Sequence, residues 1–171
     1  MLRVRGVRSW LLMALAAVVV SGCGYHVARM DRELAGRTVE IAIFANKSFR
    51  PNIEAGVADL LVDEFVRREG KSVVESGGDA VITGTILSYG TAAISYTAAD
   101  TVKEYRATIA TEVVVKKRET GQILWKGALS ATQDFPANDD LVLQQNSEDT
   151  AIREICRKLA RDVYMHFVQD F

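Results

Sequence analysis

The sequence has few of the residues that form disulfide bonds, interdomain linkers and metal sites. Its 171 residues include two cysteines, two prolines and two histidines. Two cysteines cannot form the disulfide framework of a small secreted protein. The scarcity of proline and the absence of low-complexity stretches indicate one domain without an internal linker. His26 and His166 lie far apart and have no companion at ligand spacing, so we expect no zinc site.

The sequence also lacks a basic excess and any enzymatic motif. The formal net charge is −1, which argues against nucleic acid as a partner, because nucleic-acid-binding proteins usually carry a basic excess on one face. There is no nucleophile elbow, no glycine-rich phosphate loop and no metalloprotease helix. We therefore expect a non-enzymatic protein with no metal and no cofactor.

The amino-terminal segment has the pattern of a signal peptide. It begins with arginines at positions 3, 5 and 8 and continues with an apolar run of 11 residues from Trp10 to Val20. This run is too short to span a bilayer, for which about 20 apolar residues are needed. Small residues follow the run, which is typical of a cleavage site.

The sequence Val20-Ser21-Gly22-Cys23 at the end of this segment resembles the bacterial lipobox. The resemblance implies cleavage after residues 1–22 and acylation of Cys23, whose acyl chains would anchor the protein in a membrane. Gly24 follows, where Asp often marks inner-membrane retention, so the outer membrane is the expected location. The alternative is an ordinary secretory signal with a chance cysteine. Removal of residues 1–22 would leave 149 residues with a net charge of −4, enough for a single core.

Hydrophobic periodicity divides the rest of the chain into strands and helices. It predicts strands at 38–44, 80–98, 102–117 and 122–135, a helix at 53–69 and a carboxy-terminal helix, with a short edge strand at 71–74 as an option. Gly84 and Gly90 are expected to mark bulges or a bend in the long strand. Asn138 and Ser147 are alternative caps of the last helix, and Ser147 is expected to start its main part.

The register of the last hairpin follows from the side chains that must be buried. Odd-numbered apolar residues line both 102–117 and 122–135, and a one-residue slip would expose one set. A three-residue loop with Gly121 in the left-handed region pairs odd with odd, placing Val115 opposite Trp125 and Val113 opposite Gly127. We therefore predict this loop.

Together these elements predict an α+β single domain at 37–171, following a lipidated tether at 23–36. The expected architecture is a mostly antiparallel four-stranded sheet with two helices packed on one face, in the order β-α-β-β-β-α. The other face of the sheet is then polar and available, and its expected residues are Arg106, Thr108, Lys116, Lys126, Ser130 and Thr132.

Several stretches of the chain resemble the lipopolysaccharide-assembly lipoprotein family LptE. They are the lipobox with Cys23-Gly24-Tyr25-His26, the strand Val39 to Phe44 with Asn46 and Pro51 before the helix, Ala80 to Tyr89 around Gly84-Thr85, Tyr105-Arg106-Ala107, and Thr120 to Trp125. The resemblance covers essentially the whole mature chain. It implies a non-enzymatic outer-membrane protein that plugs the barrel of LptD, helps this barrel assemble, and contacts lipopolysaccharide during its transport.

Four cations are candidate lipopolysaccharide contacts on physical grounds: Lys103, Arg106, Lys116 and Lys126. Lysine and arginine form charge-assisted bonds with phosphate, and arginine can do so through two bonds. The hairpin tip with Tyr96, Asp100 and Thr101 is a candidate contact with the barrel wall, because protruding loops often carry function. The alternative function is a lipid-anchored periplasmic adaptor or pilot for another envelope complex.

Overall fold

The computed structural model describes residues 37–69 and 73–170. In chain order the elements are β1 (Val39–Ile41), β2 (Ala45–Asn46), α2 (Ile53–Glu69), β3 (Val73–Val74), β4 (Ala80–Tyr96), β5 (Val102–Lys117), β6 (Ile123–Pro136) and α3 (Leu141–Asp170). The predicted bounds of the first helix are confirmed, and the three long strands lie where alternation predicted them.

Within residues 37–69 and 73–170 the sheet has six strands and is mixed. The prediction of four mostly antiparallel strands is therefore wrong in number and partly in direction. Its order is β3-β1-β4-β5-β6, with β2 pairing with β4 as well. β1 pairs in parallel with β3 and β4, and β2 pairs in parallel with β4. The helix between β1 and the later strands returns the chain to its starting end, which makes these pairs parallel.

The predicted register of the last hairpin is confirmed. Val115 lies opposite Trp125, and Val113 lies opposite Gly127. Gly121 has a positive φ of 69°, and its N–H donates to the carbonyl of Lys117 at 2.9 Å. The turn requires this left-handed conformation, which glycine adopts without steric cost.

The bulges of β4 lie beside Leu87 and Ile94, so the prediction that glycines mark them is wrong. Gly84 and Gly90 both have regular partners on β5. Gly84 has a different role, because the ring of Phe44 packs on its α-carbon, and a Cβ there would lie 2.2 Å from the ring. Only glycine leaves room for this side chain.

This contact also explains why the predicted first strand is divided. Residues between β1 and β2 leave the strand pattern, so that Phe44 becomes buried while Ile43 is 76% exposed. Strict alternation along the predicted strand at 38–44 would instead place Ile43 on the same buried face as Val39. The ring of Phe44 occupies the space that a side chain at Gly84 would take, and the chain turns to place it there.

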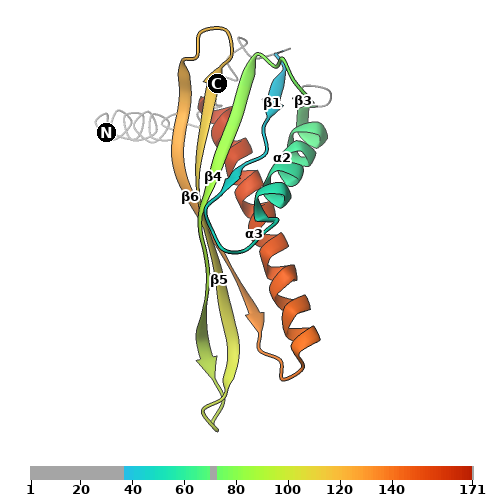
Figure 1. Cartoon of the computed structure of the whole chain (residues 1–171), viewed down its shortest axis with the longest axis vertical. Coiled ribbons are helices and arrows are strands. Elements are labelled where there is room, and N and C mark those ends of the chain that lie inside the picture. Colours follow the sequence, from blue (N-terminus) through green and yellow to red (C-terminus); the bar gives the residue numbers. More distant parts are fainter. Residues whose placement is uncertain (1–36, 70–72, 171) are drawn as a thin grey trace, which may run out of the picture.

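Both helices cover one face of the sheet, as predicted (Figure 1). The helix α2 packs beside β1 to β4, and α3 packs on β5 and β6. The helices approach each other where Gly56 faces the Cys156 thiol, and a Cβ on Gly56 would lie 3.6 Å from that sulfur. One continuous core therefore joins the sheet and the two helices.

The helix α3 begins at Leu141, six residues before the predicted main start at Ser147. The carboxylate of Asp140 accepts hydrogen bonds from the N–H groups of Val142 and Leu143 at 2.8 and 3.0 Å. It therefore caps the helix. Ser147 lies inside α3, and its hydroxyl contacts the Asn138 amide at 3.1 Å.

Figure 1 shows that the molecule is elongated. The β5–β6 turn and the start of β1 lie at one end, and the β4–β5 turn and the start of α3 lie at the other. The 17 residues of β4 correspond to roughly 55 Å at the usual rise of a strand. This length sets the distance between the candidate sites described next.

Candidate interaction surface

The face of the sheet opposite the helices, here called the outer face, carries mostly small side chains. Along β5 the odd-numbered residues from Ala107 to Val115 are buried and the even-numbered residues between them are only half-buried. Register places Thr108 opposite Gly90 and Thr132, and Ala110 opposite Ser88 and Ser130. At these positions the outer face therefore carries only small side chains.

Two of the four candidate cations lie on the outer face in ion pairs. Arg106 donates from Nε and a terminal nitrogen to the carboxylate oxygens of Asp134 at 2.7 and 2.9 Å. These hydrogen bonds hold the pKa of Asp134 below its usual value. Lys126 lies 3.1 Å from Glu112. A phosphate group would have to compete with an existing carboxylate at both positions.

The other two candidates have no such partner. In the described ranges, neither Lys103 nor Lys116 forms an ion pair. Lys116 lies on the outer face opposite Val81 of β4. It therefore offers its ammonium group to solvent without internal competition.

The structure does not gather the four cations into one site. Arg106 and Lys116 are ten residues apart on β5, which corresponds to roughly 33 Å. Lys126 pairs with Val114, close to Lys116. Lys103 and Arg106 instead lie near the β4–β5 turn. The candidates thus form two groups, one toward each end of the sheet.

The β4–β5 turn is well ordered by its own hydrogen bonds. The N–H of Thr97 donates to the Thr101 carbonyl at 2.8 Å, and the hydroxyls of these threonines lie 2.7 Å apart. Asp100 has a positive φ of 59°. Beside this turn Tyr96 is 60% exposed. The predicted contact residues Tyr96, Asp100 and Thr101 are therefore brought together on one protruding tip.

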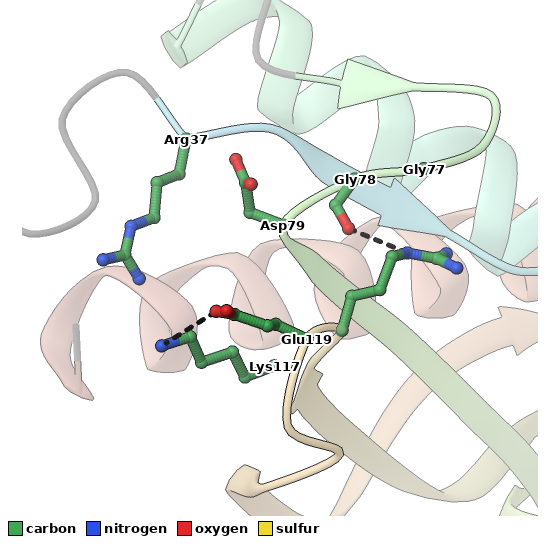
Figure 2. A pocket seen from close by; sticks show the side chains of 7 residues that line it. Arg37, Gly77, Gly78, Asp79, Lys117 and Glu119 are labelled. Atoms are coloured by element: carbon green, nitrogen blue, oxygen red, sulfur yellow. Dashed lines mark hydrogen bonds and ion pairs between the residues drawn. The ribbon is translucent and has the colours of Figure 1, made fainter.

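A cavity of about 370 Å³ lies at the opposite end and was not predicted (Figure 2). Its lining residues come from three separate segments: Arg37, Gly77, Gly78, Asp79, Lys117, Arg118 and Glu119. Arg118 donates from Nε to the Gly78 carbonyl at 2.9 Å. The Asp79 carboxylate accepts from the N–H of Thr38 at 2.8 Å, which lowers the pKa of Asp79.

The polar groups around this cavity hold the end of the sheet together. Arg118 also forms an ion pair with Glu40 of β1, and Lys117 lies 3.8 Å from Glu119. These contacts join β1, the start of β4 and the β5–β6 turn. The sequence signal for them is weak, because Gly77-Gly78-Asp79 looks like any loop.

A second polar cluster that was not predicted links the loop before α2 with α3. The hydroxyl of Tyr89, whose side chain is buried, donates to Glu148. Arg50 forms ion pairs with Glu148 and Asp149. Burial is the largest cause of a raised pKa for Tyr89, which remains a neutral donor. The cluster fixes the loop against the helix.

Comparison with known proteins identifies the family. Residues 36–167 match the sequence model of LptE, described as lipopolysaccharide assembly. The chain belongs to the LptE lipopolysaccharide-assembly family. The match spans both groups of cations, both turns and both helices, so the outer face described above is a feature of an LptE domain.

Solved structures with the LptE-like fold share little sequence with this chain. The hypothetical protein CT253 from Chlamydia trachomatis is 11% identical, with a TM-score of 0.57 over 77% of this chain and 95% of that chain. The rare lipoprotein B from Shewanella oneidensis is 12% identical, with a TM-score of 0.52 over 72% of this chain and 92% of that chain. Both show the fold. No curated protein sequence matches significantly.

The remaining predicted features of this LptE-family chain lie partly outside the described residues. Cys23, Gly24 and His26 belong to that part. His166 stacks on Trp125 with ring centroids 4.9 Å apart, and no group of three metal-ligating side chains occurs in residues 37–69 and 73–170. Within the same ranges, no helix is long and apolar enough to cross a membrane. Cys156 is buried, which raises the pKa of its thiol to about 11.

Proposed function

We propose that the chain is a non-enzymatic, lipid-anchored protein of the outer membrane that plugs and helps assemble the LptD barrel and contacts lipopolysaccharide during its transport. The observation that carries this proposal is the match to the LptE family, which runs from residue 36 to residue 167. It covers every described strand, all of α2, and all but the last three residues of α3. The proposal therefore concerns the whole domain and not one motif.

Cys23 is the proposed attachment point. Two or more acyl chains hold a protein stably in a bilayer, where one chain does not. Residues 23–36 then connect the anchor to Arg37, at the end of the molecule where β1 begins. With at most about 3.5 Å per residue, this connection reaches up to roughly 50 Å. The domain can thus leave the membrane surface while remaining tethered.

The shape and surface of the domain support a role as a plug. The long axis of roughly 55 Å exceeds the 40–45 Å of a bilayer with its headgroups, so a domain inside a barrel could reach from one side to the other. The outer face carries small side chains at its centre, which allows close approach of a partner surface. The tip with Tyr96 is the proposed contact with the barrel wall at the far end.

The proposed lipopolysaccharide contacts follow from the ion pairs of the outer face. Lys116 and Lys103 can meet a phosphate group without losing a carboxylate partner. Arg106 and Lys126 would exchange Asp134 and Glu112 for phosphate. Exposed ion pairs of this kind contribute only about 0–1 kcal/mol, so such an exchange is feasible when the incoming anion carries more charge.

The test is purification of the tagged full-length protein from its own membranes in mild detergent, with identification of every protein bound in equal amounts. We expect one large outer-membrane barrel in a one-to-one ratio. A different stoichiometric partner would overturn the plug and favour an adaptor of another envelope complex. Recovery of the tagged protein without any protein bound in equal amount would overturn the plug as well. A strain that produces the untagged protein controls for nonspecific binding.

A further inference from the structure

Strand β4 has one edge that is only half covered. On one side it pairs with β5 along its length, from Ala80 to Tyr96. On the other side β1 and β2 pair with it only as far as Ile86, whose carbonyl accepts from the N–H of Lys47 at 2.9 Å. In the part of the chain that the structure describes, nothing pairs with the rest of this edge.

The backbone groups at the open edge can be identified from the alternation of the strand. Where β1 and β2 bind, the bonding residues of β4 are those with core-facing side chains, such as Ile82 and Ile86. The chirality of a strand couples the face of each side chain to the edge that its N–H and C=O address. The bulge at Leu87 shifts the alternation by one residue, so that after it the odd-numbered residues face the core, beginning with the buried Tyr89.

Tyr89, Thr91 and Ala93 therefore direct their N–H and C=O groups to the open edge. They pair across β5 with the core-facing residues Ile109, Ala107 and Tyr105. The bulges beside Leu87 and Ile94 bound this segment, and the pairing between them is regular. Three donors and three acceptors thus alternate along an extended backbone.

Nothing in the sequence of β4 protects this edge from pairing. Natural sheets protect open edges with lysine, proline or a covering element. From Ala80 to Tyr96 there is no charged residue and no proline. Strand β6, which also has an open edge, contains Lys126 and Pro136, and the ammonium group of Lys158 donates to the Thr132 carbonyl at 2.7 Å. The two edges differ as expected if only that of β4 has an occupant.

Apolar side chains flank the open segment at both ends. Phe49 is 83% exposed, and its ring meets that of Tyr89 edge-on with centroids 6.1 Å apart. Its loop is held by Asn46, which donates to the Arg50 carbonyl and accepts from the N–H of Ser48, both at 2.8 Å. At the other end Tyr96 is 60% exposed. An apolar segment lying along the edge would cover both rings.

We propose that the open edge of β4, from Tyr89 to Ala93, binds one extended segment of the barrel partner as an additional strand. The identity of this partner rests on the proposed function. The chemistry requires a polypeptide, because only another extended backbone presents acceptors and donors at the spacing of the free N–H and C=O groups. A lipid or a flat apolar surface would leave them unpaired.

Hydrogen–deuterium exchange with single-residue resolution tests the proposal directly. The full-length protein is compared alone and in its purified complex with the barrel, in the same detergent. We expect the amides of Tyr89, Thr91 and Ala93 to exchange rapidly in the free protein and at least tenfold more slowly in the complex. The amides between them face β5 and should be protected in both samples.

Other exchange patterns would overturn the proposal. Unchanged exchange of the three amides in a complex that does form would refute strand addition and leave the plug function standing. Protection that grows with concentration in the isolated protein would instead assign the edge to a second copy. Failure to obtain any complex with a barrel would refute the proposed function, and with it this use of the edge.

A proline substitution provides an independent test. Thr91→Pro removes an N–H that faces the open edge, so the ladder with β5 keeps its bonds, and the preceding residue, Gly90, tolerates the restriction that proline imposes. We expect about tenfold less barrel to copurify. Ser130→Pro is the matched control on the edge of β6 and should have no effect on copurification. Equal retention by both variants, with unchanged melting temperatures, would overturn the proposal.

Discussion

The ring of Phe44 lies directly on the α-carbon of Gly84, in the only space that a Cβ at residue 84 could occupy. Phe44 is 2% exposed, so neither residue can shift without opening the core. Gly84→Ala should therefore destabilise the domain by about 1–3 kcal/mol, as overpacking usually does. Urea unfolding of the purified protein measures this change.

Gly90→Ala is the control for that substitution. A Cβ at Gly90 would meet no atom within 4 Å, and Gly90 also lies in β4 with a regular partner. Its replacement should leave stability unchanged or raise it slightly, since glycine weakens strands. Equal destabilisation by both substitutions would show that backbone conformation, and not the Phe44 contact, requires glycine at residue 84.

The start of α3 gives a second prediction. Asp140→Ala removes two hydrogen bonds to helix N–H groups and should cost about 1 kcal/mol of stability. Ser147→Ala removes a contact inside the helix and should cost less. Thermal unfolding of both variants distinguishes the two caps, and a larger loss with Ser147→Ala would mean that the helix starts at Ser147 in solution.

The features that the sequence predicted correctly are those with strong local constraints. The Val115–Trp125 register follows from two alternating strands and one glycine turn, which all lie within a few residues. The first helix has a clear apolar stripe and ends beside Gly70. The start of the last helix was less clear because Asn138 and Ser147 both fit a cap. In the structure neither of them caps the helix, because Asp140 accepts the hydrogen bonds instead.

The features that it missed depend on contacts between distant segments. Ile43 was expected inside, but Phe44 is buried instead, because its ring packs on Gly84, which has no side chain. The two-residue strand β2 has no periodicity to detect, whereas the optional edge strand at 71–74 is present as β3. The outer-face cations were placed correctly on β5 and β6, but the Arg106–Asp134 pair depends on the register of neighbouring strands. Alternation alone cannot predict which cations are already paired.

The buried thiol of Cys156 gives a prediction about pH. Burial raises its pKa from the usual 9.0 to about 11. At pH 8 the thiolate fraction is then about a hundredfold smaller than for an exposed thiol. In a Cys23→Ala protein, Cys156 is the remaining thiol, and it should react with a disulfide reagent at least a hundredfold faster in urea than in the native state. Fast native labelling would contradict its burial.

The same shift has a consequence for stability. A raised pKa means that the folded state favours the neutral thiol. The contribution of this thiol to the free energy of unfolding is therefore complete below pH 9 and is lost as the pH rises toward 11. Across this pH range the free energy of unfolding should decrease less for Cys156→Ser than for the unmodified chain.

The anchor is tested by removing its cysteine. Cys23→Ala should release the protein from membranes into the periplasm, because no acyl chain can be attached. Cys156→Ala is the matched control and should remain in the membrane fraction, since it removes the other cysteine. Fractionation with detection of the protein measures both. Continued retention of the Cys23→Ala protein would show that binding to a partner, and not the lipid, is its main attachment.

The last prediction concerns the group of cations formed by Lys116 and Lys126, at one end of the outer face. Lys116 has no ion pair within the described residues, whereas Lys126 lies 3.1 Å from Glu112. Binding of purified lipopolysaccharide should therefore fall more with Lys116→Gln, by about three- to tenfold, than with Lys126→Gln. Glu112→Gln should raise binding, because it releases Lys126 for phosphate. Exposed ion pairs add little stability, so melting temperatures should change little in all three variants. Equal binding by all of them would show that lipopolysaccharide does not contact this end of the outer face.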